Sequence, residues 1–205
     1  MDGHGAGFCR LRQPVYSPAF MSRRSLPLEG KLDRPVVLVG LMGAGKSTVG
    51  RRLAKRLNLP FIDTDEAIES AAGLPAGEVF QRYGEADFRD GERRLVARLI
   101  EGPVRVIATG GGAYVHPETR RLLNERAITV WLDAPVDLLA ERTARRPETR
   151  PLLNDGDRTE ILGRLIDQRR PAYAEAHIRI PSQGGSHADV VDAIVHALRQ
   201  HLEAQ

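Results

Sequence analysis

The 205-residue sequence contains a single cysteine, Cys9. One cysteine excludes an internal disulfide and any zinc site built from several cysteines, and this usage is typical of a reducing compartment. The six histidines show no HxxxH or HExxH spacing, so we expect packed or solvated histidines rather than metal ligands. These absences predict a cytoplasmic protein.

Long apolar runs and a large excess of one charge are missing as well. No run approaches the roughly 20 apolar residues that cross a membrane, so we expect no membrane partner. The formal net charge is +3, but residues 1–35 hold six basic and three acidic side chains, which leaves 24 of each sign in the rest. A formally neutral body gives little reason to expect a nucleic-acid partner, and the lack of an obvious exposed apolar stripe favours a monomer.

Residues 1–34 lack the periodicity of a helix or a strand and are rich in Gly, Pro, Ser and Arg, so we interpret them as a flexible N-terminal extension. They have no apolar segment of the roughly 7–15 residues found in a secretory signal, whereas an Arg-rich transit peptide is an alternative. Met21 offers a second start codon, a hypothesis that a native N-terminal mass beginning at Met1 would exclude. Residues 35–205 suit one domain with a substantial core.

Lysine is also scarce, because Lys31, Lys46 and Lys55 are the only lysines among 30 basic residues. Lys46 belongs to residues 40–47, GLMGAGKS, which fit the phosphate-binding pattern GxxxxGK[ST]. Residues 35–39 are apolar and β-branched, as in a buried strand, and residues 48–58 carry apolar side chains at helical spacing. Although most basic residues of this chain are arginines, position 46 of the phosphate-binding pattern is a lysine, whose compact ammonium suits such a site better than a planar guanidinium.

A loop between a strand and a helix presents backbone N–H groups and the helix dipole to phosphate. Lys46 would reach the β- and γ-phosphates of ATP, and the Ser47 hydroxyl would reach Mg²⁺. The alternative is a glycine-rich turn that binds nothing, but the flanking strand and helix favour a phosphate loop. The residues of this loop expected to contact the nucleotide are Gly43, Ala44, Gly45, Lys46, Ser47 and Thr48.

Strands and helices alternate along the body of the chain. We expect strands at residues 35–40, 60–64, 104–109, 127–132 and 177–180. We expect helices at residues 46–58, 78–100, 117–125, 135–145, 159–170 and 188–202, with the second interrupted at Gly84 and Gly91. This alternation predicts an α/β fold of three layers, with a parallel five-stranded sheet between helices, and ligands bound beyond the carboxyl ends of the strands.

Two carboxylates, Asp63 and Asp65, end the second predicted strand. In an extended chain they face the same side, and two close carboxylates cost energy unless a cation or a proton transfer uses them. Beside a phosphate loop, this favours metal support by Asp63 and base chemistry by Asp65. The alternative is that Asp65 is the N-cap of a helix that starts at residue 66.

Three glycines, Gly110 to Gly112, follow the third predicted strand. One or two suffice for a tight turn, so three suggest close approach of a ligand to the backbone. Arg89 and Glu92 lie on one helical face, where a solvated ion pair is the plain alternative. Arg169 lies near a helix end, where an arginine can simply satisfy terminal carbonyls.

Residues 145–156 are rich in Arg, Pro and Gly and separate two predicted helices, so we interpret them as a mobile loop. Near a phosphate site, such a loop is a candidate lid that excludes water and brings positive charge to a transferring phosphoryl group. A solvated basic loop is the alternative.

Taken together, these segments resemble shikimate kinase. The motifs are the phosphate loop, DTD at 63–65, FRxxE at 88–92, TGGG at 109–112, RPLL at 150–153 and RRPAY at 169–173. The match runs from residue 35 to the last helix. The resemblance implies a P-loop kinase with a lid and a nucleoside-monophosphate-kinase-like fold, strand order 2-3-1-4-5. It also implies transfer of the γ-phosphoryl of ATP, with Mg²⁺, to the 3-hydroxyl of shikimate, in chorismate and aromatic amino-acid synthesis.

The resemblance also assigns residues to the acceptor. Arg89 and Arg169 would bind the carboxylate of shikimate, for which the guanidinium fork is well shaped. Asp65 would bind ring hydroxyls and orient or deprotonate the attacking one. The residues expected to hold shikimate are Asp65, Arg89, Gly110, Gly111, Gly112 and Arg169.

At the nucleotide, the resemblance implies that Lys46 and the lid residue Arg150 neutralise charge on the γ-phosphoryl group. Ser47 would ligate Mg²⁺ directly and Asp63 through water, while Arg142 would lie over adenine. The catalytic residues would thus be Lys46, Asp65 and Arg150. This division is sensible because phosphoryl transfer needs mostly positioning and electrostatic stabilisation.

The sequence departs from the family pattern in three places. The extension before residue 35 has no counterpart in compact members. Asp90 and Gly91 stand where larger residues are usual and could loosen the segment with Arg89. The match also slips at residues 183–186.

Two other functions compete with shikimate phosphorylation. One is a gluconate or nucleotide kinase of the same fold. Such a kinase would need neither the two arginines poised for a ring carboxylate nor the TGGG segment. The other is a non-catalytic nucleotide-binding module.

Overall fold

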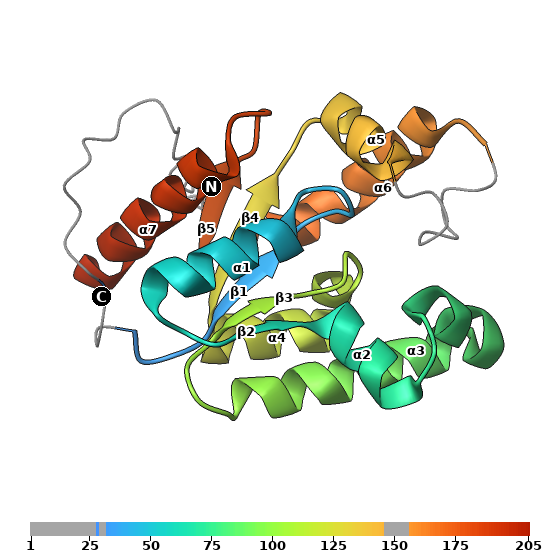
Figure 1. Cartoon of the computed structure of the whole chain (residues 1–205), viewed down its shortest axis with the longest axis horizontal. Helices are drawn as coiled ribbons and strands as arrows, with labels where there is room; N and C mark the ends of the chain where they lie inside the picture. The colour runs from blue at the N-terminus through green and yellow to red at the C-terminus, as the bar shows by residue number, and fades with distance from the viewer. Residues whose placement is uncertain (1–27, 29–31, 146–155) are drawn as a thin grey trace, which may run out of the picture.

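The computed structural model describes Leu28 and residues 32–145 and 156–205 (Figure 1). A parallel sheet of five strands lies at the centre of the described chain, in the order β2-β3-β1-β4-β5. Its strands are β1 (Val36–Val39), β2 (Phe61–Asp63), β3 (Val106–Ala108), β4 (Ile128–Asp133) and β5 (Ile178–Pro181). The predicted parallel sheet and its strand order are confirmed.

Helices cover both faces of the sheet and give the predicted three layers (Figure 1). They are α1 (Lys46–Leu57), α2 (Thr64–Ala72), α3 (Ala76–Ile100), α4 (Pro117–Arg126), α5 (Val136–Ala144), α6 (Arg158–Tyr173) and α7 (His187–Glu203), with a short 3₁₀ turn, η2 (Ala113–Val115). Helices α1 and α7 pack side by side on one face, and α4 lies on the other with α3 beside it. None of the helices in this part of the chain is both long and apolar enough to cross a bilayer.

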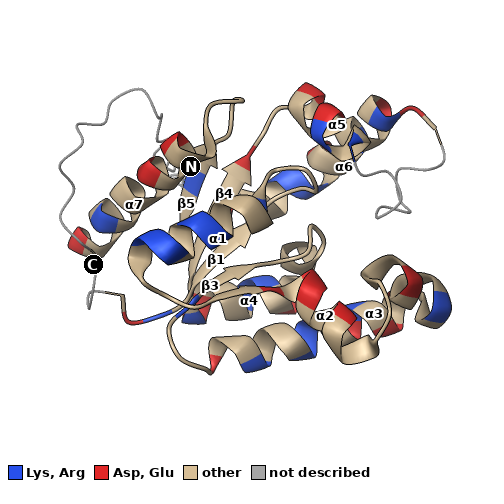
Figure 2. Ribbon diagram, in the orientation of Figure 1, with Lys and Arg blue, Asp and Glu red and all other residues tan. Residues whose placement is uncertain are grey.

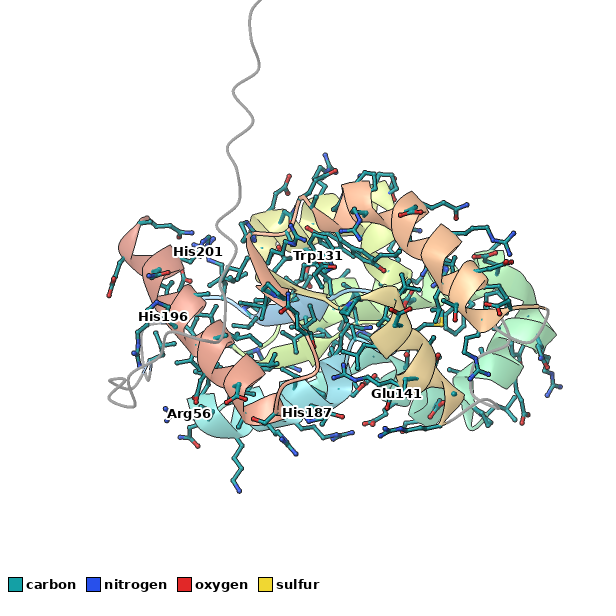
Figure 3. The ribbon with its side chains drawn as sticks, turned by 90° about the horizontal axis from the view of Figure 1, so that it is seen from above. Arg56, Trp131, Glu141, His187, His196 and His201 are labelled. Atoms are coloured by element: carbon teal, nitrogen blue, oxygen red, sulfur yellow. The ribbon has the colours of Figure 1, made fainter. Side chains whose placement is uncertain are left out.

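The core explains why the apolar β-branched runs form strands. All four residues of β1 are fully buried, as expected for a central strand of a parallel sheet with helices on both faces. In β4, Trp131 is 2% exposed and points into the interior of the molecule (Figure 3). Leu28, which precedes the predicted domain boundary at residue 35, also belongs to this core.

The strand register brings three loops to one edge of the sheet. Leu38 of β1 pairs with Ala108 of β3, and Ala108 in turn pairs with Asp63 at the end of β2. The phosphate loop, the DTD segment and the TGGG segment therefore leave the sheet side by side at its carboxyl edge.

The start of α2 corrects one expectation. The helix begins at Thr64, and Oδ1 of Asp63 accepts a hydrogen bond from the backbone N–H of Asp65 at 3.0 Å. Asp63 is therefore the N-cap, and the alternative that Asp65 caps this helix is wrong. The extended chain ends at Asp63, so Asp63 and Asp65 do not face the same side as neighbours in one strand. The hydrogen bond from the Asp65 N–H to the Asp63 carboxylate relates them instead.

Helix α3 confirms one predicted interruption and contradicts the other. Gly84 has φ 83° and ψ 168°, a conformation that breaks the helix and favours glycine. Gly91 remains helical, so the predicted interruption there is wrong. Asp90 forms ion pairs with Arg93 and Arg94, three and four residues along, and such pairs across the turn stabilise the helix at Gly91.

Candidate active site

A pocket of about 500 Å³ opens at the carboxyl edge of the sheet. Lys46 of α1 and Asp65 of α2 both line it, and Figure 2 shows basic residues along α1 and acidic residues along α2. The predicted site residues that line it are Gly43, Gly45, Lys46, Ser47, Thr48, Asp63, Asp65, Arg89, Gly110, Gly111, Gly112, Arg142 and Arg169. Of the others, Ala44 is buried within the loop at 1% exposure, and Arg150 lies outside the described residues.

The phosphate loop is shaped by backbone conformations that favour glycine. Gly43 and Gly45 have φ values of 82° and 94°, and a Cβ on Gly43 would lie 3.1 Å from the carbonyl oxygen of Leu139. The loop therefore needs glycine at Gly43 both for its conformation and for its close approach to α5.

Two cations fix the outline of this loop. The Nζ atom of Lys46 donates to the carbonyl oxygens of Gly40 at 2.9 Å and Leu41 at 3.0 Å. From α5, Nη1 of Arg142 donates to the carbonyl oxygens of Gly43 at 3.4 Å and Ala44 at 3.5 Å. Burial lowers the pKa of Arg142 from its ordinary value. The loop thus carries positive charge on both of its sides.

Asp65 lines the pocket and has an altered pKa. Although its carboxylate is open to solvent in the pocket, the surrounding protein limits its hydration, and this desolvation together with the charge of Asp63 raises its pKa. The cations Lys46 and Arg89 act in the opposite direction. A carboxylate with a raised pKa in a pocket is suited to proton transfer.

Arg89 pairs with a buried partner. Its Nη1 atom lies 3.0 Å from Oε2 of Glu92, whose side chain is 2% exposed, so the alternative of a solvated ion pair is wrong. Burial raises the pKa of Glu92, and the charge of Arg89 opposes this. Sequence reasoning gave Glu92 no role in the site, although the FRxxE spacing contained the signal.

The glycines after β3 leave space for side chains of the same pocket. A Cβ on Gly110 would lie 2.4 Å from Oε1 of Glu92 and 2.9 Å from Oδ1 of Asp65, and one on Gly112 would lie 2.6 Å from Nη1 of Arg89. At these distances a larger residue would force the side chain of Glu92, Asp65 or Arg89 to move. A tight turn alone does not account for this, whereas the packing of Asp65, Arg89 and Glu92 against the backbone does.

Arg169 contacts the same segment from α6. Its Nη1 atom donates to the carbonyl oxygen of Gly111 at 3.1 Å, and the hydroxyl of Tyr173 donates to that oxygen at 2.5 Å. Because this guanidinium donates to Gly111, outside α6, the alternative that Arg169 satisfies carbonyls at the end of its own helix is wrong. Sequence reasoning missed Tyr173 as a partner of Gly111, since nothing local links residues 62 positions apart.

The chain is similar to known proteins over most of its length. A family model described as shikimate kinase matches residues 42–199. A curated shikimate kinase from Rhodopseudomonas palustris is 52% identical over 170 residues, which cover 83% of each chain. The protein belongs to the shikimate kinase family. A shikimate kinase from Caulobacter vibrioides is likewise 52% identical, over 85% of each chain.

Solved structures agree with membership of the shikimate kinase family. The shikimate kinase of Acinetobacter baumannii, solved in complex with shikimate, is 38% identical with a TM-score of 0.79 and covers 82% of this chain and 93% of its own. A gluconokinase from Sinorhizobium meliloti has a TM-score of 0.56 at 18% identity, which shows a shared fold alone. The predicted family and the predicted kinase class are confirmed.

The site of this shikimate kinase family member has ligands suited to a magnesium ion. Ser47 and Asp63 line the same pocket and offer a hydroxyl and a carboxylate, both hard oxygen donors. Within the described chain, no group of three or more His, Cys, Asp or Glu side chains is arranged to hold a metal. This donor set fits Mg²⁺, which is usually bound by one or two protein oxygens together with water and substrate phosphates.

Proposed function

We propose that the protein transfers the γ-phosphoryl group of ATP to the 3-hydroxyl of shikimate in a Mg²⁺-dependent reaction, as a monomer in the cytoplasm. The reaction yields shikimate 3-phosphate and ADP and belongs to the synthesis of chorismate and the aromatic amino acids. One observation carries the proposal: a phosphate loop and a separate set of guanidinium and carboxylate groups line a single pocket of about 500 Å³ in a member of the shikimate kinase family.

The nucleotide occupies the end of the pocket formed by the phosphate loop. Backbone N–H groups at the start of α1 hold the phosphates, and Lys46 turns its ammonium toward the β- and γ-phosphates. Arg142, which lines the pocket beside the loop, covers adenine. The proposal includes Arg150 as a further cation on the γ-phosphoryl group, although it lies outside the described residues.

Shikimate occupies the other end, between α3, the TGGG segment and α6. Arg89 and Arg169 bind its carboxylate, because forked guanidinium groups form paired, charge-assisted hydrogen bonds to a planar anion. The backbone of Gly110, Gly111 and Gly112 lines the adjoining wall. Asp65 reaches the ring hydroxyls.

The chemical step is an in-line displacement in which positioning and charge stabilisation do most of the catalysis. The 3-hydroxyl oxygen forms a bond to the γ-phosphorus, and the bond from that phosphorus to the β–γ bridging oxygen breaks. Asp65 accepts the hydroxyl proton, for which its raised pKa is favourable. Ser47 and, through water, Asp63 would hold Mg²⁺, which would supply charge neutralisation at the β- and γ-phosphates.

The test is release of ADP from ATP and Mg²⁺, measured with and without shikimate. We expect strong shikimate-dependent release that is lost in Lys46→Ala and in the presence of a chelator. Gluconate and nucleoside monophosphates serve as competing acceptors. Phosphorylation of either of these but not of shikimate would overturn the substrate, and nucleotide binding without any acceptor-dependent release would favour a non-catalytic module.

A further inference from the structure

The carbonyl oxygen of Gly111 accepts two hydrogen bonds from the last turns of α6. Nη1 of Arg169 lies 3.1 Å from this oxygen and the hydroxyl of Tyr173 lies 2.5 Å from it. A carbonyl oxygen has two lone pairs, so these two donors satisfy it fully. One of the two donors is the arginine proposed to bind the carboxylate of shikimate.

The hydroxyl of Tyr173 is held rigidly. The side chain is fully buried, and its ring stacks on Trp131 at 5.9 Å and on Tyr114 at 6.4 Å between ring centroids. Burial raises the pKa of Tyr173 to about 12, so the hydroxyl keeps its proton and remains a donor at neutral pH. Because Trp131 lies in β4, this aromatic stack ties the hydroxyl to the central sheet.

The Gly111 peptide lies where the two ends of the pocket meet. A Cβ added to Gly111 would lie 3.2 Å from the backbone nitrogen of Met42 in the phosphate loop and 3.7 Å from Nη1 of Arg169. A small displacement of this peptide would therefore change the position of Arg169 relative to the phosphate loop. Positioning errors of this size are costly in phosphoryl transfer, because the reaction depends on alignment.

We propose that Tyr173 is a positioning residue for shikimate, which acts by holding the Gly111 carbonyl so that Arg169 can present its guanidinium to the substrate carboxylate. This inference rests on the proposed function. Without the hydroxyl, Arg169 is the one remaining side-chain donor to Gly111 among the described residues, and the carbonyl and the substrate carboxylate compete for it. With the hydroxyl in place, the carbonyl depends less on the arginine.

Tyr173→Phe removes the hydroxyl and keeps the ring, and Tyr114→Phe is a matched control. Tyr114 is also fully buried and stacks on Tyr173, but its hydroxyl donates to Oδ1 of Asn124 at 2.7 Å. We expect Tyr173→Phe to raise the KM for shikimate about three- to tenfold, the worth of one hydrogen bond, with kcat and the KM for ATP within about twofold. Tyr114→Phe should leave all three unchanged.

A double-mutant cycle tests whether Tyr173 acts through Arg169. In an Arg169→Ala background, adding Tyr173→Phe should change the KM for shikimate no further, because the group that the hydroxyl positions is gone. The two Tyr→Phe variants should lose similar thermal stability. Fluorescence of Trp131, the single tryptophan, reports whether the stack is intact.

Several results would overturn the inference. They are an unchanged KM for shikimate in Tyr173→Phe, an equal rise in the KM of both substrates, the same effect in Tyr114→Phe, or a full additional effect in the Arg169→Ala background. If the wild-type protein shows no shikimate-dependent release of ADP, the proposed function fails and this inference fails with it. A normal wild type with an unaffected Tyr173→Phe removes this inference alone.

Discussion

Arg89 and Glu92 form an ion pair with one buried member: Nη1 of Arg89 lies 3.0 Å from Oε2 of a carboxylate that is 2% exposed. The other oxygen, Oε1, has no hydrogen-bond partner within the described residues. Burial of a carboxylate with one unsatisfied oxygen costs stability, which the pairing with Arg89 offsets only in part. The geometry therefore holds Arg89, the arginine proposed to bind shikimate, at the expense of folding stability.

Glu92→Gln tests this trade-off. Because burial raises the pKa of Glu92 above its ordinary value of 4.5, the folded protein holds this proton to higher pH than the unfolded chain does. Stability contributed at this site is therefore present below pH 4.5 and is lost as the pH rises through the raised pKa. We expect the glutamine variant to melt at a higher temperature than wild type at pH 8, with the difference shrinking toward pH 4.5, and to have a higher KM for shikimate.

The measurement is thermal unfolding of both proteins across this pH range. Glu118→Gln is the control, because Glu118 is 63% exposed and pairs with Arg93 on the surface. Its melting temperature should follow that of wild type at every pH. A glutamine variant at position 92 that is equally destabilised at pH 4.5 and pH 8 would show that ionisation of Glu92 is not what costs stability.

Asp65→Asn tests the proposed general base. We expect turnover to fall by about 10²–10⁴, the usual range for a lost acid–base group, with the KM for ATP within about twofold. Glu66→Gln is a suitable control, because the neighbouring carboxylate is exposed and pairs with Arg51. Turnover near the wild-type value in Asp65→Asn would remove the assignment.

The pH profile gives a second reading of Asp65. A base must be ionised to act, and the surrounding protein and Asp63 raise its pKa above the ordinary 3.8. We expect kcat/KM for shikimate to rise with pH through this raised pKa and then level off. An acid limb that persists unchanged in the residual activity of Asp65→Asn would point to another group.

Arg89→Ala separates shikimate binding from nucleotide binding. Truncating one partner of a charge-assisted pair costs about 2–5 kcal/mol. The lower end of this range corresponds to about a 30-fold change in affinity, so we expect shikimate affinity to fall by at least about that much and ATP affinity to change little. Arg93→Ala on the same helix removes only surface ion pairs with Asp90 and Glu118. Equal losses for both ligands in Arg89→Ala would indicate a folding defect, which titration calorimetry with each ligand would reveal.

Gly112→Ala and Gly91→Ala form a matched pair of glycine substitutions. A Cβ at residue 112 would lie 2.6 Å from Nη1 of Arg89, so the arginine must move, and we expect weaker shikimate binding in a protein that still folds. A Cβ at residue 91 meets nothing within 4 Å in a helix, so we expect a stabilisation of about 0.5–1 kcal/mol and normal activity. Chemical denaturation and the KM for shikimate measure both, and normal shikimate binding by Gly112→Ala would contradict the packing argument.

The fold and the phosphate loop could be predicted because their signals are local. The β-branched run of β1, the glycines of the loop and the apolar spacing of α1 follow one another in the chain, and Lys46 stands out in a lysine-poor sequence. The strand order came from a resemblance that rested on several motifs in the right order. Each of these motifs can be recognised from residues that are close together in the sequence.

Contacts between distant segments could not be predicted in the same way. The bond from Tyr173 to Gly111 and the fit of Arg89 against Gly112 depend on how α6 and α3 pack at the sheet edge. The position of the α2 cap depended on where β2 ends, and a shift of two residues exchanged the capping role of Asp65 for that of Asp63. Gly91 stays helical where Asp90 forms ion pairs with Arg93 and Arg94, contacts that propensity alone does not reveal.

Gly110 and Gly112 leave room for Glu92 and Arg89, and this interlock limits how the protein can evolve toward a new acceptor. A larger residue at position 112 forces the Arg89 side chain to move unless residue 89 has shortened, whereas a shortened residue 89 alone leaves an unfilled hollow. Paths to altered specificity on this scaffold therefore pass through paired changes. Libraries that vary residues 89 and 112 jointly should contain more folded, active members than libraries that vary either position by itself.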